Sequence, residues 1–164
     1  MKNLFCFLVA FSPLVGAGQA LHSHADAAWM HPIEQLFKGM AAGDSALVRS
    51  AFVADATLVT IGHDAQGNPR LRRTTLAAFL AAVAAPRAEP WAEPIWNISA
   101  DHTQQFVQVW AEYAFYVGKR FSHCGIDTFQ LVQDRQGHWK IFHLADTRRQ
   151  EGCVIPEAVS SRFR

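Results

Sequence analysis

The sequence has no marked excess of charge of either sign: 15 Lys and Arg stand against 14 Asp and Glu, for a formal net charge of +1. Surfaces that bind nucleic acid usually carry a basic face, so the composition does not indicate nucleic acid as a partner. The chain has only 3 cysteines, and their spacing fits no zinc motif. A Gly-x-Ser-x-Gly elbow and a glycine-rich phosphate loop are both absent. We therefore expect neither a metal nor a cofactor.

One long hydrophobic run is present, and it lies at the N-terminus. Lys2 precedes an apolar stretch over residues 4–15, and Gly18 and Ala20 place small residues before a possible cut. This is the pattern of a signal peptide over residues 1–20, cleaved after Ala20. The alternative is an uncleaved anchor, but the run is shorter than the ~20 residues that span a bilayer. We predict a periplasmic or secreted protein that does not contact the membrane after cleavage.

Cleavage leaves two cysteines, Cys124 and Cys153, in an oxidising compartment. A disulfide can persist there, although each residue could equally be a buried free thiol. The sequence leaves both possibilities open, because it does not show whether the two residues lie within the ~6 Å that a bridge needs.

The first half of the mature chain has helical periodicity. One apolar helix face is formed by Trp29, Ile33, Leu36, Phe37 and Met40. Gly43 can end this helix, and Asp44 can cap a second one. A third helix is predicted over residues 75–84, with Thr74 as its cap.

The second half alternates with the period of strands. After a strand at residues 56–61, we expect an extended edge piece over residues 90–99 and three longer strands, at 104–117, 121–133 and 139–147. We expect a solvated loop between the first strand and the third helix, in the basic stretch that holds Arg70, Arg72 and Arg73. Helices followed by consecutive strands predict an α+β fold, in which about three N-terminal helices pack on the concave face of a curved antiparallel sheet.

Three stretches carry a resemblance to a known superfamily. They are Ala42-Gly43-Asp44 between the helices, the segment 52–56 that enters the first strand, and the segment 137–149. The chain resembles the nuclear transport factor 2-like superfamily, also called SnoaL-like or cystatin-like, and most closely its small bacterial members described as putative lumazine-binding or uncharacterised. The resemblance implies a cone-shaped domain over residues 29–152, between a flexible N-terminus at 21–28 and a C-terminal tail at 153–164. It also implies a pocket inside the cone and, in many members, a homodimer.

The length of the hairpin loop between Asp134 and His138 predicts which residues of the two strands pair with each other. A three-residue loop that ends at Gly137 pairs these two residues. The pairs that follow are Leu131 with Ile141, Phe129 with His143, Asp127 with Ala145 and His123 with Arg149. Asp127 and His143 are then diagonal neighbours on the inner face, with Cα atoms ~7–8 Å apart. A four-residue loop would exchange the two faces.

A candidate catalytic set follows from this register. Asp127 or His143 would be the base, Tyr113 a hydrogen-bond donor and His123 an alternate acid. Residues expected to contact a small, largely apolar, oxygenated ligand are Val109, Phe115, Phe129, Trp139, Ile141 and Arg149. A ligand-binding domain is favoured, and a cofactor-independent lyase, isomerase or cyclase is the alternative. The polar groups could also be purely structural, in a pocket filled by the protein's own side chains.

Other residues suggest weaker interactions. Arg148 and Arg149 could bind an anionic group at the pocket mouth, or pair with Asp146 and Glu151, which we favour. The outer sheet face carries Phe106, Trp110 and Tyr116, which would be left in water if helices cover only the inner face. We therefore predict a homodimer through these three rings, and a dimeric interaction module without a ligand is a third possible function.

Overall fold

The computed structural model describes residues 27–164. The predicted signal peptide at 1–20, and most of the N-terminal segment at 21–28, lie outside the described residues. Across the part that is described, no helix is long and apolar enough to cross a membrane.

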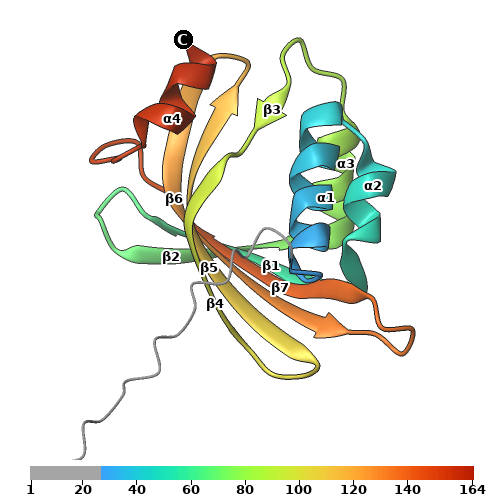
Figure 1. Ribbon diagram of the computed structural model, residues 1–164. Helices are drawn as coiled ribbons and strands as arrows, with labels where there is room; N and C mark the ends of the chain where they lie inside the picture. The colour runs from blue at the N-terminus through green and yellow to red at the C-terminus, as the bar shows by residue number, and fades with distance from the viewer. Residues whose placement is uncertain (1–26) are drawn as a thin grey trace, which may run out of the picture.

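The chain folds into a strongly curved sheet with its three N-terminal helices on the concave side (Figure 1). The elements are α1 (Met30–Ala42), α2 (Ser45–Ser50), β1 (Phe52–His63), β2 (Pro69–Thr75), α3 (Leu76–Ala84), β3 (Trp91–Ala92), β4 (Ile95–His102), β5 (Phe106–Val117), β6 (Arg120–Gln133), β7 (Trp139–Thr147), α4 (Glu157–Ser160) and the 3₁₀ helix η2 (Ser161–Phe163). The strand order is β2-β1-β7-β6-β5-β3, with β4 also paired to β5. The α+β prediction is confirmed, although the sheet is mixed because β1 runs parallel to β7.

Short-range signals explain the helix boundaries, with one correction. Gly43 ends α1 in a left-handed conformation at φ +70°, and the Asp44 carboxylate accepts a hydrogen bond of 2.9 Å from the Leu47 N–H at the start of α2. The predicted cap of α3, Thr74, is wrong by one residue. Thr75 accepts the capping bond from the Ala78 N–H at 3.2 Å, because β2 continues through Thr75 in its pairing with β1.

The apolar face of α1 packs against the inner face of the sheet and forms the core. Ile33, Leu36 and Met40 are buried there, and the Phe37 ring meets the Phe129 ring edge-on at 6.1 Å between centroids. The expected alternation of β5 is also present: Val107, Val109, Ala111 and Tyr113 are all buried.

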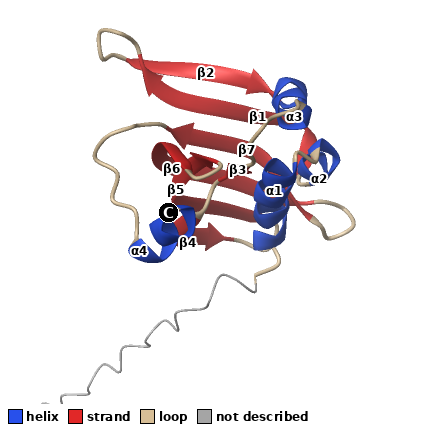
Figure 2. Cartoon of the chain, turned by 90° about the horizontal axis from the view of Figure 1, so that it is seen from above, coloured by secondary structure: helices blue, strands red, loops and turns tan. Residues whose placement is uncertain are grey.

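The basic segment at 69–75, predicted to be a loop, is a strand. β2 pairs antiparallel with β1, so that Arg72 lies opposite Thr60, and the two strands form a hairpin that projects from the body of the protein (Figure 2). The only large hydrophobic residue of β2, Leu71, is 55% exposed. An edge strand of this kind has no apolar alternation, which is the signal that sequence reasoning uses.

The last hairpin begins in the predicted register and then departs from it. The Asp134 N–H donates to the His138 carbonyl at 2.8 Å, and Leu131 pairs with Ile141. Gln130 then pairs with His143, which leaves Phe142 as an extra residue in β7. Such a β-bulge exchanges the faces of every residue beyond it.

The predicted Asp127–His143 pair is therefore wrong. Asp127 pairs with Asp146, and Phe129 pairs with Leu144. His143 lies on the opposite face of the sheet from Asp127, where its Nδ1 is 2.5 Å from the Thr57 hydroxyl.

The C-terminal segment is fastened to the outside of the sheet. A disulfide joins Cys124 of β6 to Cys153, and the Cys124 and Arg149 backbones exchange two hydrogen bonds of 2.9 Å, where His123 was expected to face Arg149. The Phe163 ring stacks on Tyr116 at 3.9 Å between centroids. Tyr116 is therefore buried by its own chain, and the expectation that it is left in water is wrong.

Candidate functional site

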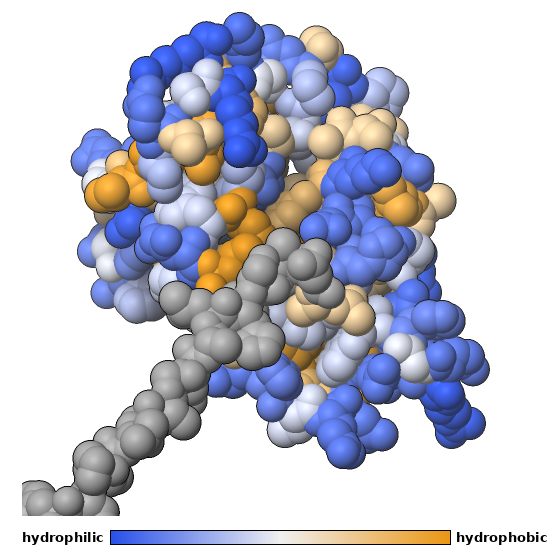
Figure 3. Space-filling view, in the orientation of Figure 1, coloured by the Kyte–Doolittle hydropathy of each residue, from blue (hydrophilic) through white to orange (hydrophobic). Residues whose placement is uncertain are grey.

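A cavity of about 440 Å³ lies between the helices and the concave face of the sheet. Seen from one side, the hydrophobic surface of the protein gathers near the middle and is surrounded by hydrophilic residues (Figure 3). The apolar wall of the cavity consists of Leu36, Met40, Leu58, Val59, Ala78, Phe79, Ala82, Trp91, Phe115 and Leu144. The polar side chains are Thr60, Arg72, Thr74, Glu93, Tyr113, Ser122, His123, Asp127, Asp146 and Arg148.

Asp127 is the buried acid of this cavity. Its side chain comes from the middle of β6, it is 2% exposed, and no donor within residues 27–164 reaches its Oδ2. Burial raises the pKa of Asp127 well above its usual range, and the nearby charge of Glu93 adds to the effect. The cavity therefore disfavours the charged form of this carboxyl.

Glu93 lies beside Asp127 and completes a carboxyl pair. It follows the short strand β3 and precedes Pro94, and the two carboxyl groups form a hydrogen bond. Burial raises the pKa of Glu93 to about 7, while the hydrogen bond from Asp127 opposes the rise. A hydrogen bond between two carboxyl groups requires a proton on one of them, and the raised pKa values of both groups favour this singly protonated pair.

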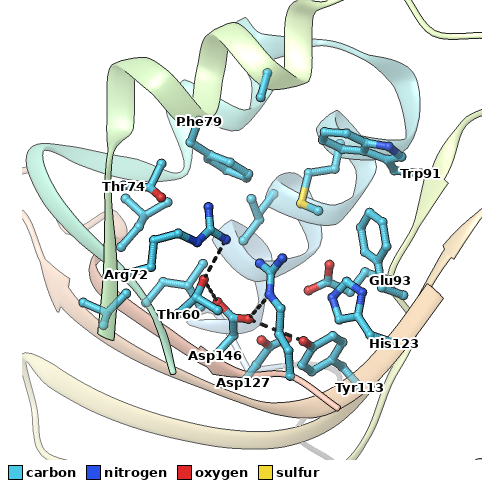
Figure 4. Close-up of a pocket in the computed structure, with 18 of the residues that line it drawn as sticks. Thr60, Arg72, Thr74, Phe79, Trp91, Glu93, Tyr113, His123, Asp127 and Asp146 are labelled. Carbon is cyan, nitrogen blue, oxygen red and sulfur yellow. Dashed lines mark hydrogen bonds and ion pairs between the residues drawn. The ribbon is translucent and has the colours of Figure 1, made fainter. Parts of the chain in front are cut away.

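The third acid, Asp146, accepts two short hydrogen bonds and a longer one from Tyr113 (Figure 4). The Thr60 hydroxyl donates to Oδ1 at 2.8 Å, and the Arg148 Nε–H donates to Oδ2 at 2.6 Å. Arg72 joins the same network through a hydrogen bond of 3.4 Å from Nη2 to the Thr60 hydroxyl. The network therefore runs from β2 through β1 to β7.

Tyr113 closes the floor of the cavity. Its hydroxyl donates to the Thr147 carbonyl at 2.9 Å and lies 3.5 Å from Asp146 Oδ2. Burial, followed by the charge of Asp146, raises the pKa of Tyr113, so the phenol stays protonated. Gly125 makes this contact possible: a Cβ there would lie 1.8 Å from the Thr147 oxygen and 2.9 Å from the Tyr113 ring.

His123 lies between aromatic rings on the same wall. It stacks on Phe115 at 5.0 Å and meets the edge of Tyr113 at 5.7 Å between centroids. Burial lowers the pKa of His123 to about 4, and the charge of Arg148 contributes in the same direction. The imidazole is therefore neutral at physiological pH, with Nδ1 at 3.0 Å from the Ser122 hydroxyl.

The structure brings together part of the candidate set. Asp127, Tyr113, His123 and Phe115 line the cavity, whereas His143 does not. Of the other residues expected to contact a ligand, Val109, Phe129 and Ile141 are fully buried in the core, Trp139 packs against that core, and Arg149 is exposed with its Nε directed at Cys124.

Sequence reasoning missed Glu93, and it did not place Asp146 or Arg72 in the pocket. The available signal for Glu93 was a single acid two residues after Trp91, in the short segment between Pro90 and Pro94. Asp146 faces the cavity only because of the bulge at Phe142.

In chemical terms, the site offers a carboxyl pair with one exchangeable proton and a neutral imidazole beside an apolar wall. Such groups can hydrogen-bond a ligand or move a proton near neutral pH. Residues 27–164 contain no cluster of three or more His, Cys, Asp or Glu side chains placed to hold a metal ion.

Solved structures with this fold come from several bacteria. A nuclear transport factor 2-like protein of unknown function from Pseudomonas aeruginosa aligns with 16% identity and a TM-score of 0.59, over 75% of this chain and 99% of its own. A protein described as a putative ketosteroid isomerase, from Shewanella frigidimarina, aligns with 16% identity and a TM-score of 0.55, over 74% of this chain and 95% of its own. A protein described as a putative scytalone dehydratase, from Novosphingobium aromaticivorans, aligns with 12% identity and a TM-score of 0.56, over 79% and 87%. At these identities the likeness establishes the fold alone.

Comparison with curated proteins finds no match. A family model does match, over residues 24–143, and its description is "putative lumazine-binding". Because this match spans most of the chain, the protein belongs to that family. Its fold is that of the nuclear transport factor 2-like structures.

Proposed function

We propose that the protein binds a small, largely apolar, oxygenated molecule in the cavity between α1, α3 and the sheet. The observation that carries this proposal is the cavity itself, whose apolar wall surrounds the buried Asp127 carboxyl. An N–H or O–H of a ligand can form a hydrogen bond with this carboxyl, in addition to the one that it forms with Glu93. The cavity volume of about 440 Å³ is also in the usual range for small-molecule sites.

The shape of the wall favours a flat ligand. The Phe79, Trp91 and Phe115 side chains line the cavity together, and the last two rings meet at 5.7 Å between centroids. The description of the family supports testing lumazine itself among the probes.

A cavity-filling substitution tests the proposal. Ala77 and Ala78 of α3 are both exposed, but only Ala78 lines the cavity. Native mass spectrometry of the wild-type protein with a set of bicyclic aromatic probes, lumazine included, should detect a bound probe. Ala78→Trp should lower the bound fraction at least about tenfold, while the control Ala77→Trp should leave it unchanged. Equal binding by all three proteins would contradict the proposal.

A second candidate is a cofactor-independent lyase or isomerase that acts by proton transfer. Glu93, whose pKa burial raises to about 7, favours this function, because a general base works best when its pKa is near the working pH. The role of base, which we expected of Asp127 or His143, would then be shared by Asp127 and Glu93, with neutral His123 as the alternate group. His143, on the other face, would take no part.

Hydrogen exchange tests this second function. A bound enolisable cyclic ketone in D₂O should exchange its α-protons faster with wild-type protein than with Glu93→Gln, as followed by NMR. Glu89→Gln, outside the cavity, is the control. Exchange that is no faster with the wild type than with Glu93→Gln would exclude Glu93 as the base.

We also propose that the protein is exported and that the signal peptide is cleaved after Ala20. The Cys124–Cys153 disulfide supports this proposal, because such bonds persist mainly in oxidising compartments. The intact mass of the protein recovered from the periplasm or medium of its own host should correspond to a chain that begins at residue 21. A full-length mass in the cytoplasm would contradict export.

A further inference from the structure

We infer that the ligand is an anion, namely an apolar carboxylate whose charged group lies between Arg72 and Arg148. This inference rests on the proposed function and specifies the ligand class for the same cavity.

Arg72 reaches the cavity from β2 with its charge unbalanced. Its guanidinium points from the strand toward the interior of the pocket (Figure 4). Its one hydrogen bond is the 3.4 Å contact with the Thr60 hydroxyl, and it takes part in none of the ion pairs found within residues 27–164. Most of its five N–H donors are therefore free to bind a ligand.

Arg148 presents its free donors to the same cavity. It uses Nε for the 2.6 Å contact with Asp146, and its two terminal NH₂ groups make no hydrogen bond within the described chain. Its side chain is 42% exposed, as expected at a cavity mouth. Hydrogen bonds from Arg72 to Thr60, from Thr60 to Asp146 and from Arg148 to Asp146 connect the two guanidinium groups and orient them.

The neighbouring charges favour a carboxylate over a phosphate. Asp146 balances Arg148, and the proton shared by Glu93 and Asp127 removes one of their two charges. A phosphate dianion would meet stronger repulsion from these acids than a carboxylate with one charge. An oxygen pair of a carboxylate also matches the planar fork of a guanidinium.

Two matched probes and two matched variants test this inference. Naphthalene-2-carboxylate and naphthalene-2-carboxamide differ in charge but hardly in shape. Arg72→Gln removes one guanidinium from the cavity, whereas Arg73→Gln removes the same charge from the next residue of β2, which does not line the cavity. Isothermal titration calorimetry gives the affinity of each protein for each probe.

We expect the wild-type protein to bind the carboxylate at least about tenfold more tightly than the amide. Arg72→Gln should remove most of that preference and leave the affinity for the amide unchanged, and Arg73→Gln should behave as the wild type. If both probes bind equally to all three proteins, the proposal of an anion site is contradicted, while the proposal that the cavity binds a small molecule stands. If neither probe binds to the wild type, both inferences are contradicted.

Discussion

Asp127 of β6 and Asp146 of β7 are direct partners across the sheet, and both side chains line the same cavity. Like charges placed opposite each other destabilise a sheet. The two acids avoid this repulsion because their surroundings differ. Asp146 receives donors from Thr60 and Arg148, whereas Asp127 shares a proton with Glu93.

The first prediction concerns the dependence of stability on pH. The pKa of Glu93 rises from an ordinary value of 4.5 to about 7 on folding, and that of Asp127 rises as well. Between about pH 4.5 and pH 7 the folded state therefore binds more protons than the unfolded state. For Glu93, the resulting stabilisation is complete below about pH 4.5 and is lost as the pH rises through about 7. This part amounts to about 3 kcal/mol.

Urea unfolding at a series of pH values measures this effect. The lowered pKa of His123 makes the protein more stable as the pH rises from about 4 to 6.5, which opposes the effect of the acids. The experiment therefore compares proteins that all retain His123. Asp127→Asn lets an amide donate to ionised Glu93, and it should flatten the fall in the free energy of unfolding. Asp101→Asn, at an exposed position of β4, should follow the wild type. Parallel curves for wild type and Asp127→Asn would contradict the shared proton.

The second prediction concerns Gly125. Gly125→Ala would force its Cβ against the Thr147 carbonyl and the Tyr113 ring, so the free energy of unfolding should fall by about 3 kcal/mol or more. The matched control is Gly62→Ala in β1, where nothing lies within 4 Å of the new Cβ. Equal stabilities of the two variants in urea would refute the close packing beneath Tyr113.

The third prediction concerns the C-terminal segment. Cys153→Ser opens a loop closed by residues 29 apart in sequence, which should cost about 3–4 kcal/mol in the free energy of unfolding. Reduction of the wild-type protein should give the same loss, and a reductant should not change Cys153→Ser. A loss below about 1 kcal/mol would mean that packing of Phe163 on Tyr116 is enough to hold the segment.

The fourth prediction concerns the outer sheet face. Phe106 contacts Phe142 at 6.3 Å between centroids, and Trp110 is 39% exposed. We propose that these rings, without Tyr116, form a homodimer interface. Sedimentation should show a dimer of the wild type at micromolar concentration and a monomer of Trp110→Lys. Leu71→Lys, on the projecting hairpin, should remain dimeric. A monomeric wild type would exclude both the dimer and a function that resides in it.

The sequence permits a correct prediction of the fold wherever periodicity is strong. The apolar face of α1 and the alternation of β5 lie where their spacing predicts, because burial of one face dictates both patterns. β2 was missed because an exposed edge strand, with Leu71 as its one large apolar residue, has no such pattern.

The site was predictable only in part. Tyr113, His123 and Asp127 lie on strands with a clear inner face, and all three line the cavity. The position of His143 depends on one extra residue, Phe142, and no local sequence signal marks a bulge of this kind. Glu93 is positioned by a short strand between two prolines, so only the three-dimensional structure brings it to Asp127.

The most direct test of ligand binding in this cavity uses the methionine methyl groups. The chain has 3 methionines, of which Met40 lines the cavity while Met30 is buried in the core away from it. In ¹³C-methyl NMR spectra, titration with naphthalene-2-carboxylate should shift the Met40 signal and leave the Met30 signal in place. Saturation of binding with no change at Met40 would place the ligand elsewhere and contradict the proposed site.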